Sequence, residues 1–302
     1  DRIPVYETQI QGDIARARKV EAIKTGLEVL RKLKIKVPFK PNVGHVVIAL
    51  LRTRLALLRH PIAELVKLPR MTDPRVLTAM RIATRISSTA YVVDPNLFAA
   101  LVLKEVELSA RYGNADVSPF AYALYGTIHC GVLHDYKRGY NFGKMALVLQ
   151  DKLEESEHLP RTAFTSAATS QHYMESLRDT FEPLLNAYKR ALENGDLEFG
   201  GTNSGVYGYH LFFSGRNLVD VSSELTYYTE VLEQIKQDAY LGYLRLYLQV
   251  AKNLLGEAKH PWTINGSVAK LDDYLQLAND ASDGHGIFNA HLCEGIVRTI
   301  GE

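Results

Sequence analysis

The segment "GVLHDYKRGYNFGKMALVL", residues 131–149, has the pattern of a turn followed by a helix that carries glycine in its first turns. Small residues recur on that helix at four- and three-residue steps, at Gly139, Gly143 and Ala146. Each glycine costs about 1 kcal/mol of helix stability relative to alanine. Close packing against a neighbouring helix can offset this cost, so the segment predicts one member of a tightly packed helical array.

Helical periodicity extends over most of the 302 residues, and no sustained period-two pattern predicts a sheet. Asp73-Pro74 and Asp94-Pro95 have the pattern of an N-cap followed by proline at the first helical position, and Ser118-Pro119 resembles them. Gly113 is placed to end a helix. The predicted helices cover residues 14–34, 43–59, 74–93, 95–112, 118–133, 136–153, 160–172, 175–194, 197–213, 218–236, 239–256, 268–281 and 287–300.

Small residues also recur at long range. Gly126, Ala167 and Gly208 are each separated by 41 residues, and Gly242 follows 34 residues later. Each lies in the first helix of a predicted pair with a short connection, which favours antiparallel hairpins. Small residues that allow two helix backbones to approach are typical of tetratricopeptide repeats. The sequence therefore predicts an all-α fold in which hairpins stack as a tetratricopeptide-like, right-handed superhelix, an α-solenoid. A non-repeating helical bundle is the alternative.

The same pattern predicts the domain organisation. Residues 1–258 are expected to form the repeat domain, and residues 259–302 a C-terminal helical extension or the start of a further repeat. Because the chain starts at Asp1, we expect it to be a piece of a longer polypeptide.

Charge and cysteine usage narrow the class of protein. The chain carries 35 basic and 34 acidic residues, which gives no electrostatic reason to expect binding to nucleic acid or to an anionic membrane. No apolar run reaches the 18 residues of a membrane span. Cys130 and Cys293 form no CxxC or Cys/His cluster, so we expect no metal and no disulfide framework. Two cysteines without a disulfide framework fit the reducing environment of the cytoplasm, so we expect a cytoplasmic location.

Catalytic motifs are absent from the sequence. It contains no phosphate-binding loop of the GxxxxGK[ST] type, no GxGxxG after a strand, no kinase signature, and neither HExxH nor GxSxG. The glycine-rich stretch at 199–208 is better explained as a helix start with packed small residues. His129 and His134 are five residues apart, a poor spacing for two metal ligands on one helix. We therefore predict no catalytic and no metal-binding residue, and no cofactor in this part of the protein.

The candidate ligand groove follows from the repeat register. In tetratricopeptide-like arrays the first helix of each hairpin lines the concave face. If Gly126 and Gly208 are equivalent, the residues one and four positions further along should face the groove, with Phe120 at its edge. The predicted groove residues are Phe120, Thr127, Cys130, Tyr209 and Phe212. The alternative is that the large apolar side chains belong to the core.

Several stretches, taken in order, resemble a known family. They are "AIKTGLEVLRKLKIKVPFKPN" at 22–42, "MTDPRVLTAMRIATRISSTAYVVDPNLFAALVLKEVELSARYGNADVSPFAYALYGTIHCGVL" at 71–133, "YNFGKMALVL" at 140–149, "FEPLLNAYKRALENGDLEF" at 181–199 and "FFSGRNL" at 212–218. Together they resemble the helical-repeat region of very large bacterial signalling proteins. In these proteins a Ser/Thr kinase-like domain and a STAND-type (AAA-like) predicted ATPase precede the repeats. GAF-type sensor domains and often a sensor histidine kinase follow them. The resemblance covers about residues 1–258.

The resemblance implies a function without catalytic residues, because the family's catalytic motifs lie in other domains. It implies a regulatory or sensor segment that binds a protein, peptide or small ligand and couples it to kinase output, with ATP and Mg²⁺ bound only elsewhere in the parent protein. Expected partners are a protein, a peptide or adjacent domains of the same chain, and a homo-oligomer is left open. The alternatives are a stand-alone peptide-sensing or transcriptional regulator scaffold, and a helical enzyme with an unrecognised site.

Overall fold

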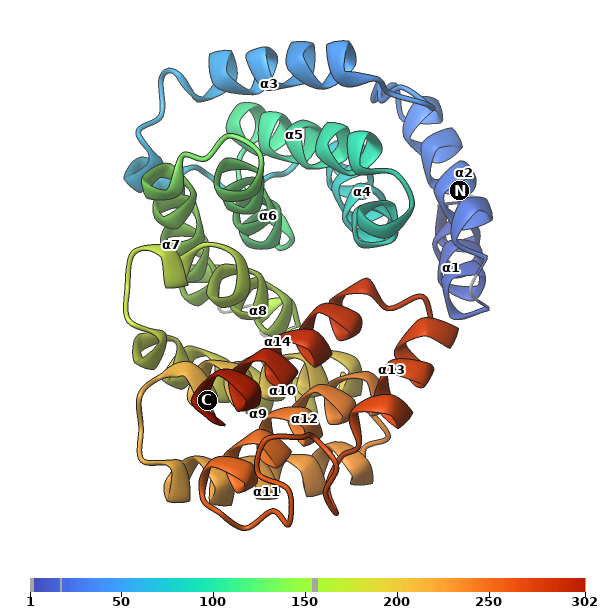
Figure 1. Ribbon diagram of the computed structural model, residues 1–302. Coiled ribbons are helices and arrows are strands. Elements are labelled where there is room, and N and C mark those ends of the chain that lie inside the picture. Colours follow the sequence, from blue (N-terminus) through green and yellow to red (C-terminus); the bar gives the residue numbers. More distant parts are fainter. Residues whose placement is uncertain (1–2, 17, 154–156, 302) are drawn as a thin grey trace. The chain divides into compact units, whose positions relative to one another are not determined.

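The computed structural model describes residues 3–16, 18–153 and 157–301, and within these ranges the chain is all-helical, with two isolated β-bridges and no strand. Figure 1 shows the order of the helices. The α-helices are α1 Ile3–Ala15, α2 Lys19–Lys32, α3 Val43–Leu57, α4 Pro74–Val93, α5 Pro95–Tyr112, α6 Ser118–Gly131, α7 Tyr136–Leu153, α8 Leu159–Thr169, α9 Phe181–Glu193, α10 Leu197–Phe213, α11 Leu218–Gln234, α12 Asp238–Leu254, α13 Leu271–Asp280 and α14 Gly284–Gly301. Three 3₁₀ helices are η1 Ile62–Lys67, η2 Gln171–Tyr173 and η3 Leu177–Thr180.

Local sequence signals explain several helix ends. The Asp73 side chain accepts hydrogen bonds from the backbone N–H groups of Arg75 and Val76, and Asp94 caps α5 in the same way. Gly113 ends α5 with φ at +96°, in the region that favours glycine. These predictions are confirmed. Ser118 differs, because its hydroxyl accepts from the N–H of Ala115 ahead of α6 and the helix has no side-chain cap.

The N-terminal region corrects one prediction. Residues 14–34 do not form a single helix, because α1 ends at Ala15 and α2 begins at Lys19. Two contacts between Asp13 and Arg18 stabilise the chain at this break. The Asp13 carbonyl oxygen accepts from the backbone N–H of Arg18, and the Asp13 carboxylate forms an ion pair with the Arg18 guanidinium. The two helices pack against each other, and α2 also packs against α4.

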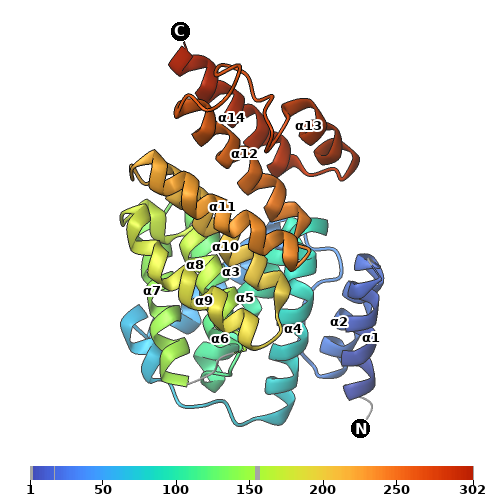
Figure 2. The same cartoon turned by 90° about the horizontal axis from the view of Figure 1, so that it is seen from below.

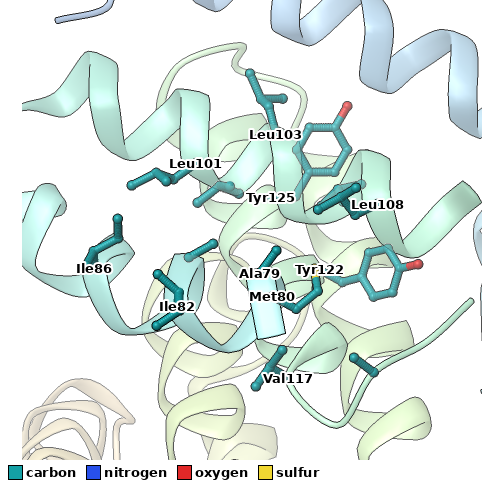
Figure 3. Packing of buried hydrophobic residues seen from close by; sticks show 14 of the residues in the cluster. Ala79, Met80, Ile82, Ile86, Leu101, Leu103, Leu108, Val117, Tyr122 and Tyr125 are labelled. Atoms are coloured by element: carbon teal, nitrogen blue, oxygen red, sulfur yellow. The ribbon is translucent and has the colours of Figure 1, made fainter. Parts of the chain in front are cut away.

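The chain divides into two compact units, Asp1–Met174 and Glu175–Glu302. In the first unit, α4 packs against α5, α5 against α6, and α6 against both α7 and α8, while α3 lies along the outer side of α5 (Figure 1). Buried side chains of α4, α5 and α6 fill the centre of this unit. Figure 3 shows Ile82 and Ile86 of α4, Leu101 of α5, and Tyr122 and Tyr125 of α6 among them.

Glycines set the spacing between α6, α7 and α8. A Cβ atom on Gly126 would lie 2.8 Å from the carbonyl oxygen of Gly139, so the backbones of α6 and α7 are in direct contact there. One turn along α7, a Cβ atom on Gly143 would lie 2.5 Å from the Ser170 hydroxyl, which follows α8. The predicted close packing of Gly126 against the partner helix of its hairpin is confirmed. Ala167 of α8 is also buried, but α8 packs on α6 and α7, which precede it, so the prediction that Ala167 packs within a hairpin with the following helix is not confirmed.

A glycine also lies between packed helices in the second unit. Helix α10 packs against α9, α11 and α12, and α12 packs against α14, which contacts α13 (Figure 2). A Cβ atom on Gly208 would lie 3.1 Å from the Leu225 side chain of α11 and 2.2 Å from the Leu244 side chain of α12. Gly208 therefore packs against its hairpin partner, as predicted, and also against the next helix. Residues beyond 258 pack on α12 through α14, within this unit.

The segment from Leu58 to Asp73 is fastened to distant parts of the first unit. The N–H of Met71 donates to the carbonyl oxygen of Asn114, and the N–H of Asn114 donates to that of Pro69. The Asn114 side chain donates to the Leu65 carbonyl oxygen at 2.8 Å. At the end of α7, the Lys152 ammonium donates to the Val66 carbonyl oxygen at 2.8 Å.

Candidate binding sites

The α6 half of the predicted groove is closed. Phe120 and Cys130 are buried, at 4% and 2% exposure, because α5, α7 and α8 surround α6. Neither side chain can reach a ligand, so their assignment to an open groove is corrected. Burial raises the pKa of the Cys130 thiol to about 11, which also removes it as a nucleophile. Thr127 is half-buried, and its hydroxyl is 2.7 Å from that of Thr169 in α8.

The α10 half of the groove is partly open. Tyr209 and Phe212 are half-buried, and the neighbouring Phe213 is exposed. The Phe212 ring packs 5.0 Å from that of Phe213 and 5.2 Å from that of Tyr247 in α12, measured between centroids. Burial raises the pKa of the Tyr209 hydroxyl, so this side chain stays neutral. The role of Tyr209 and Phe212 as ligand contacts stays a prediction.

Helix α3 carries an exposed apolar surface that was not predicted from the sequence. Its inner side packs on α5, where the Thr53 hydroxyl donates to the Leu103 carbonyl oxygen at 2.8 Å. Its outer side exposes aliphatic residues at helical spacing, from 49% exposure at Val47 to 75% at Leu58. We call this surface the α3 stripe; it consists of Val43, Val47, Ile48, Leu51, Leu55 and Leu58.

Arginines border the α3 stripe on both edges. At 100° per residue, Arg52 lies beside Ile48 on one edge and Arg54 lies beside Val47 on the other, and Arg59 follows Leu58 just after the end of α3. All three arginines are exposed. The sequence contains no Asp or Glu between Glu28 and Glu64. The stripe is therefore an apolar surface with cationic borders and no local acid to neutralise them.

A cavity of about 670 Å³ lies between α12 and α13 in the second unit. Its apolar wall includes Leu241, Leu277 and the Tyr274 ring, which approaches α12 where Gly242 has no side chain. Both acidic and basic side chains line it, including Asp238, Arg245, Lys270, Asp273 and Asp283. This mixture gives no preference for a ligand of either charge.

Two ionisable groups with shifted pKa values, His129 and Glu105, are buried in the first unit. Burial lowers the pKa of His129 to about 4, with smaller contributions from Arg138 and Arg54, and Asp135 opposes the shift. Burial raises the pKa of Glu105 to about 7, against the hydrogen bonds from Thr84 and Ser87. Each group is fully enclosed, so a substrate has no access to it. Within the described ranges, no three His, Cys, Asp or Glu side chains are grouped to hold a metal ion.

Comparison with known proteins gives one informative match. No family profile matches the chain. The chain is 25% identical, over 128 residues, to the hybrid signal transduction histidine kinase G of Dictyostelium discoideum. The matched stretch is 42% of this chain and 4% of that protein's length. The match is consistent with a signalling protein. Among the described residues, no helix combines the length and apolar character needed to cross a membrane.

Proposed function

We propose that the chain is a non-catalytic regulatory segment of a multidomain signal-transduction kinase, and that it binds a protein partner through the α3 stripe. The similarity to a hybrid histidine kinase supports the signalling context. The helix-to-helix approach at Gly126, Gly139 and Gly143 supports a tetratricopeptide-like superhelix, because small residues at such approaches are typical of that repeat. An ATPase of the STAND type in the parent protein and a cytoplasmic location belong to the same proposal.

The observation that carries the proposal is the α3 stripe. Monomeric soluble proteins seldom expose a contiguous apolar surface of this length, and such surfaces commonly mark interaction sites. Leu51, Leu55 and Leu58 follow one another at four- and three-residue steps. Side chains at this spacing can pack against the apolar face of an amphipathic partner helix. The stripe therefore favours a helix laid along α3 over an extended peptide.

The charges beside the stripe determine the chemistry of that helix. Arg52, Arg54 and Arg59 would face a partner's polar edges. Two copies of α3 packed on each other would bring arginines together without an acid, which disfavours self-association through this surface. We therefore propose an amphipathic helix with Leu or Ile on one face and Glu or Asp on its borders, contributed by a protein partner or by another domain of the same polypeptide.

Removing two leucines from the stripe tests this interaction. A synthetic 18-residue amphipathic peptide with Leu on one face and Glu borders should bind the full chain, as measured by fluorescence anisotropy. The double variant Leu51→Ser/Leu55→Ser should weaken binding at least tenfold, because each buried leucine contributes about 1.5–3 kcal/mol. Since both side chains are exposed, the melting temperature should stay nearly constant.

A matched control is Val148→Ser, which removes an equally exposed aliphatic side chain from α7 and should leave binding unchanged. The same peptide with Lys borders should bind much more weakly. Equal binding of the two peptides would contradict the charge argument. Binding to phosphatidylserine vesicles without binding to the acidic peptide would show that the stripe is a membrane surface instead.

Nucleotide binding tests the non-catalytic part of the proposal. We expect calorimetry of this chain with ATP and Mg²⁺ to give no micromolar binding and no hydrolysis, because phosphate loops and kinase signatures are absent from the sequence. A saturable heat signal at micromolar ATP would contradict this expectation and favour a helical enzyme.

A further inference from the structure

A second cavity lies where the end of α3 and the residues after it approach α7. Its volume is about 470 Å³, within the range of small-molecule sites. Three basic side chains line it: Arg54 from α3, His60 from the following segment, and Arg138 from the first turn of α7. Leu57, Ile62 and the ring of Phe142 form apolar walls. The lining thus combines cationic groups with an apolar surface.

The two arginines lack counter-charges. Other arginines of the first unit pair with carboxylates, for example Arg70 with Asp116 at 2.8 Å and Arg81 with Glu7 at 3.2 Å. Within the described ranges, neither Arg54 nor Arg138 has a carboxylate oxygen within 4.0 Å. Asp135 accepts from the backbone N–H of Arg138 and not from its guanidinium, so two guanidinium groups against one carboxylate leave a positive potential at the cavity.

One carboxylate lies behind the cavity: Oδ2 of Asp135 is 3.8 Å from Nδ1 of His129, and its Oδ1 accepts from the backbone N–H of Arg138. Phe142 separates the cavity from His129, whose ring stacks on it at 5.7 Å, and from Tyr125, whose ring packs edge-on at 4.8 Å. Both ring nitrogens of His129 are buried and make no hydrogen bond in the part of the chain that the structure describes, and the Arg54 guanidinium lies close to the buried Tyr125 hydroxyl. Arg54 and Arg138 act electrostatically on both groups. Buried polar groups without partners are rare in proteins, and they mark this as a place where a ligand could rearrange the local contacts.

We infer that this cavity binds a small organic anion, with a phosphate or carboxylate group held by Arg54 and Arg138 and an apolar body placed against Leu57, Ile62 and Phe142. Guanidinium groups match both oxyanions because each presents several donors in one plane. The cavity is larger than an inorganic anion. The space beside its apolar walls can hold the apolar part of an organic anion. The inference extends beyond the α3 stripe, since Arg138 and Phe142 belong to α7.

Calorimetry of the full chain with phenyl phosphate, benzoate and inorganic phosphate tests the inference. We expect saturable binding of phenyl phosphate or benzoate with a dissociation constant near 10⁻⁴ M, and the stronger of the two identifies the oxyanion. Inorganic phosphate should bind at least tenfold more weakly, because it cannot use the apolar walls. Arg138→Gln and Arg54→Gln should each weaken the organic anion about tenfold or more, as expected for the loss of a charged hydrogen-bond donor.

Arg52→Gln is the matched control, because Arg52 lies on the same helix as Arg54 but outside the cavity. It should leave the dissociation constant unchanged. Addition of phenyl phosphate should also shift the ring resonances of His129 in spectra of histidine-labelled protein. The inference fails if neither organic anion binds, if Arg52→Gln weakens binding as much as Arg138→Gln, or if phenol binds as well as phenyl phosphate. Arg138→Gln should leave binding of the acidic peptide to the α3 stripe intact, so the two proposals are tested separately.

Discussion

Replacing Gly126 with leucine should lower the free energy of unfolding by about 3 kcal/mol, at the upper end of the usual cost of overpacking. Even a Cβ atom at this position would lie 2.8 Å from the carbonyl oxygen of Gly139 and 3.5 Å from the amide nitrogen of Gly143. These atoms belong to the backbone of α7, so they cannot move aside as a flexible side chain could. Urea denaturation monitored by circular dichroism measures the change.

Gly131→Ala is the control for this experiment. Gly131 lies at the end of the same helix, and a Cβ atom there would meet no atom within 4 Å. The substitution should leave stability unchanged or raise it slightly, because alanine favours helix more than glycine does. If Gly126→Leu were as stable as Gly131→Ala, the proposed approach of α6 and α7 would be wrong.

Glu105→Gln should remove a large pH dependence of stability. The Glu105 carboxyl is buried between α4 and α5, where Thr84 donates to one oxygen at 2.5 Å and the Ser87 hydroxyl lies 3.0 Å from the other. The Ser87 hydroxyl also donates to the Ala83 carbonyl oxygen, so a protonated Glu105 can donate to Ser87. A glutamine amide can replace that donor, which makes Gln a neutral substitute for the protonated acid.

The direction of the effect follows from the raised pKa. The pKa of Glu105 is about 7 in the folded chain and 4.5 without the fold, so between these values the folded state binds more protons. Stability contributed by this group is therefore complete below pH 4.5, is lost as the pH rises towards 7, and stays lost above it. The difference between the two pKa values corresponds to a loss of about 3 kcal/mol in the free energy of unfolding.

The measurement is a comparison of the wild type with Glu105→Gln at pH 5 and pH 8. The other carboxylates titrate equally in the wild type and in the variant. The difference in the free energy of unfolding between these two proteins therefore reports on Glu105 alone. The variant should be more stable than the wild type at pH 8 and similar to it at pH 5. A constant difference across this range would show that Glu105 ionises with an ordinary pKa.

Short-range signals made much of the fold predictable. The pairs Asp73-Pro74 and Asp94-Pro95 fixed two helix starts, and Gly113 fixed one helix end. The helices at 136–153 and 197–213 were predicted with their observed bounds, because they combine strong periodicity with clear breaks on both sides. The break between α1 and α2 was missed because it depends on a contact between Asp13 and Arg18 and not on a proline or glycine.

Burial was harder to predict than helicity. Phe120 and Cys130 were predicted to face a groove, but α5, α7 and α8 pack around α6 and bury both side chains. The number of helices that pack around α6 cannot be derived from one sequence. The α3 stripe was missed for a related reason. Apolar residues occupy both sides of α3, so its sequence does not indicate which side packs on α5. The cavity beside Arg138 could not be predicted either, since it joins residues about 80 positions apart.

The fastening of residues 58–73 limits how this protein can evolve. In a simple repeat array each hairpin contacts only its neighbours, so a hairpin can be duplicated or lost without disturbing the rest. Here the segment depends on Asn114 before α6 and on Lys152 at the end of α7. Gly113 must also stay a glycine, because a Cβ atom there would lie 2.2 Å from the Pro69 carbonyl oxygen. Loss of the α6–α7 hairpin would remove these contacts, so we expect residues 58–73 and the hairpin to be retained or lost together.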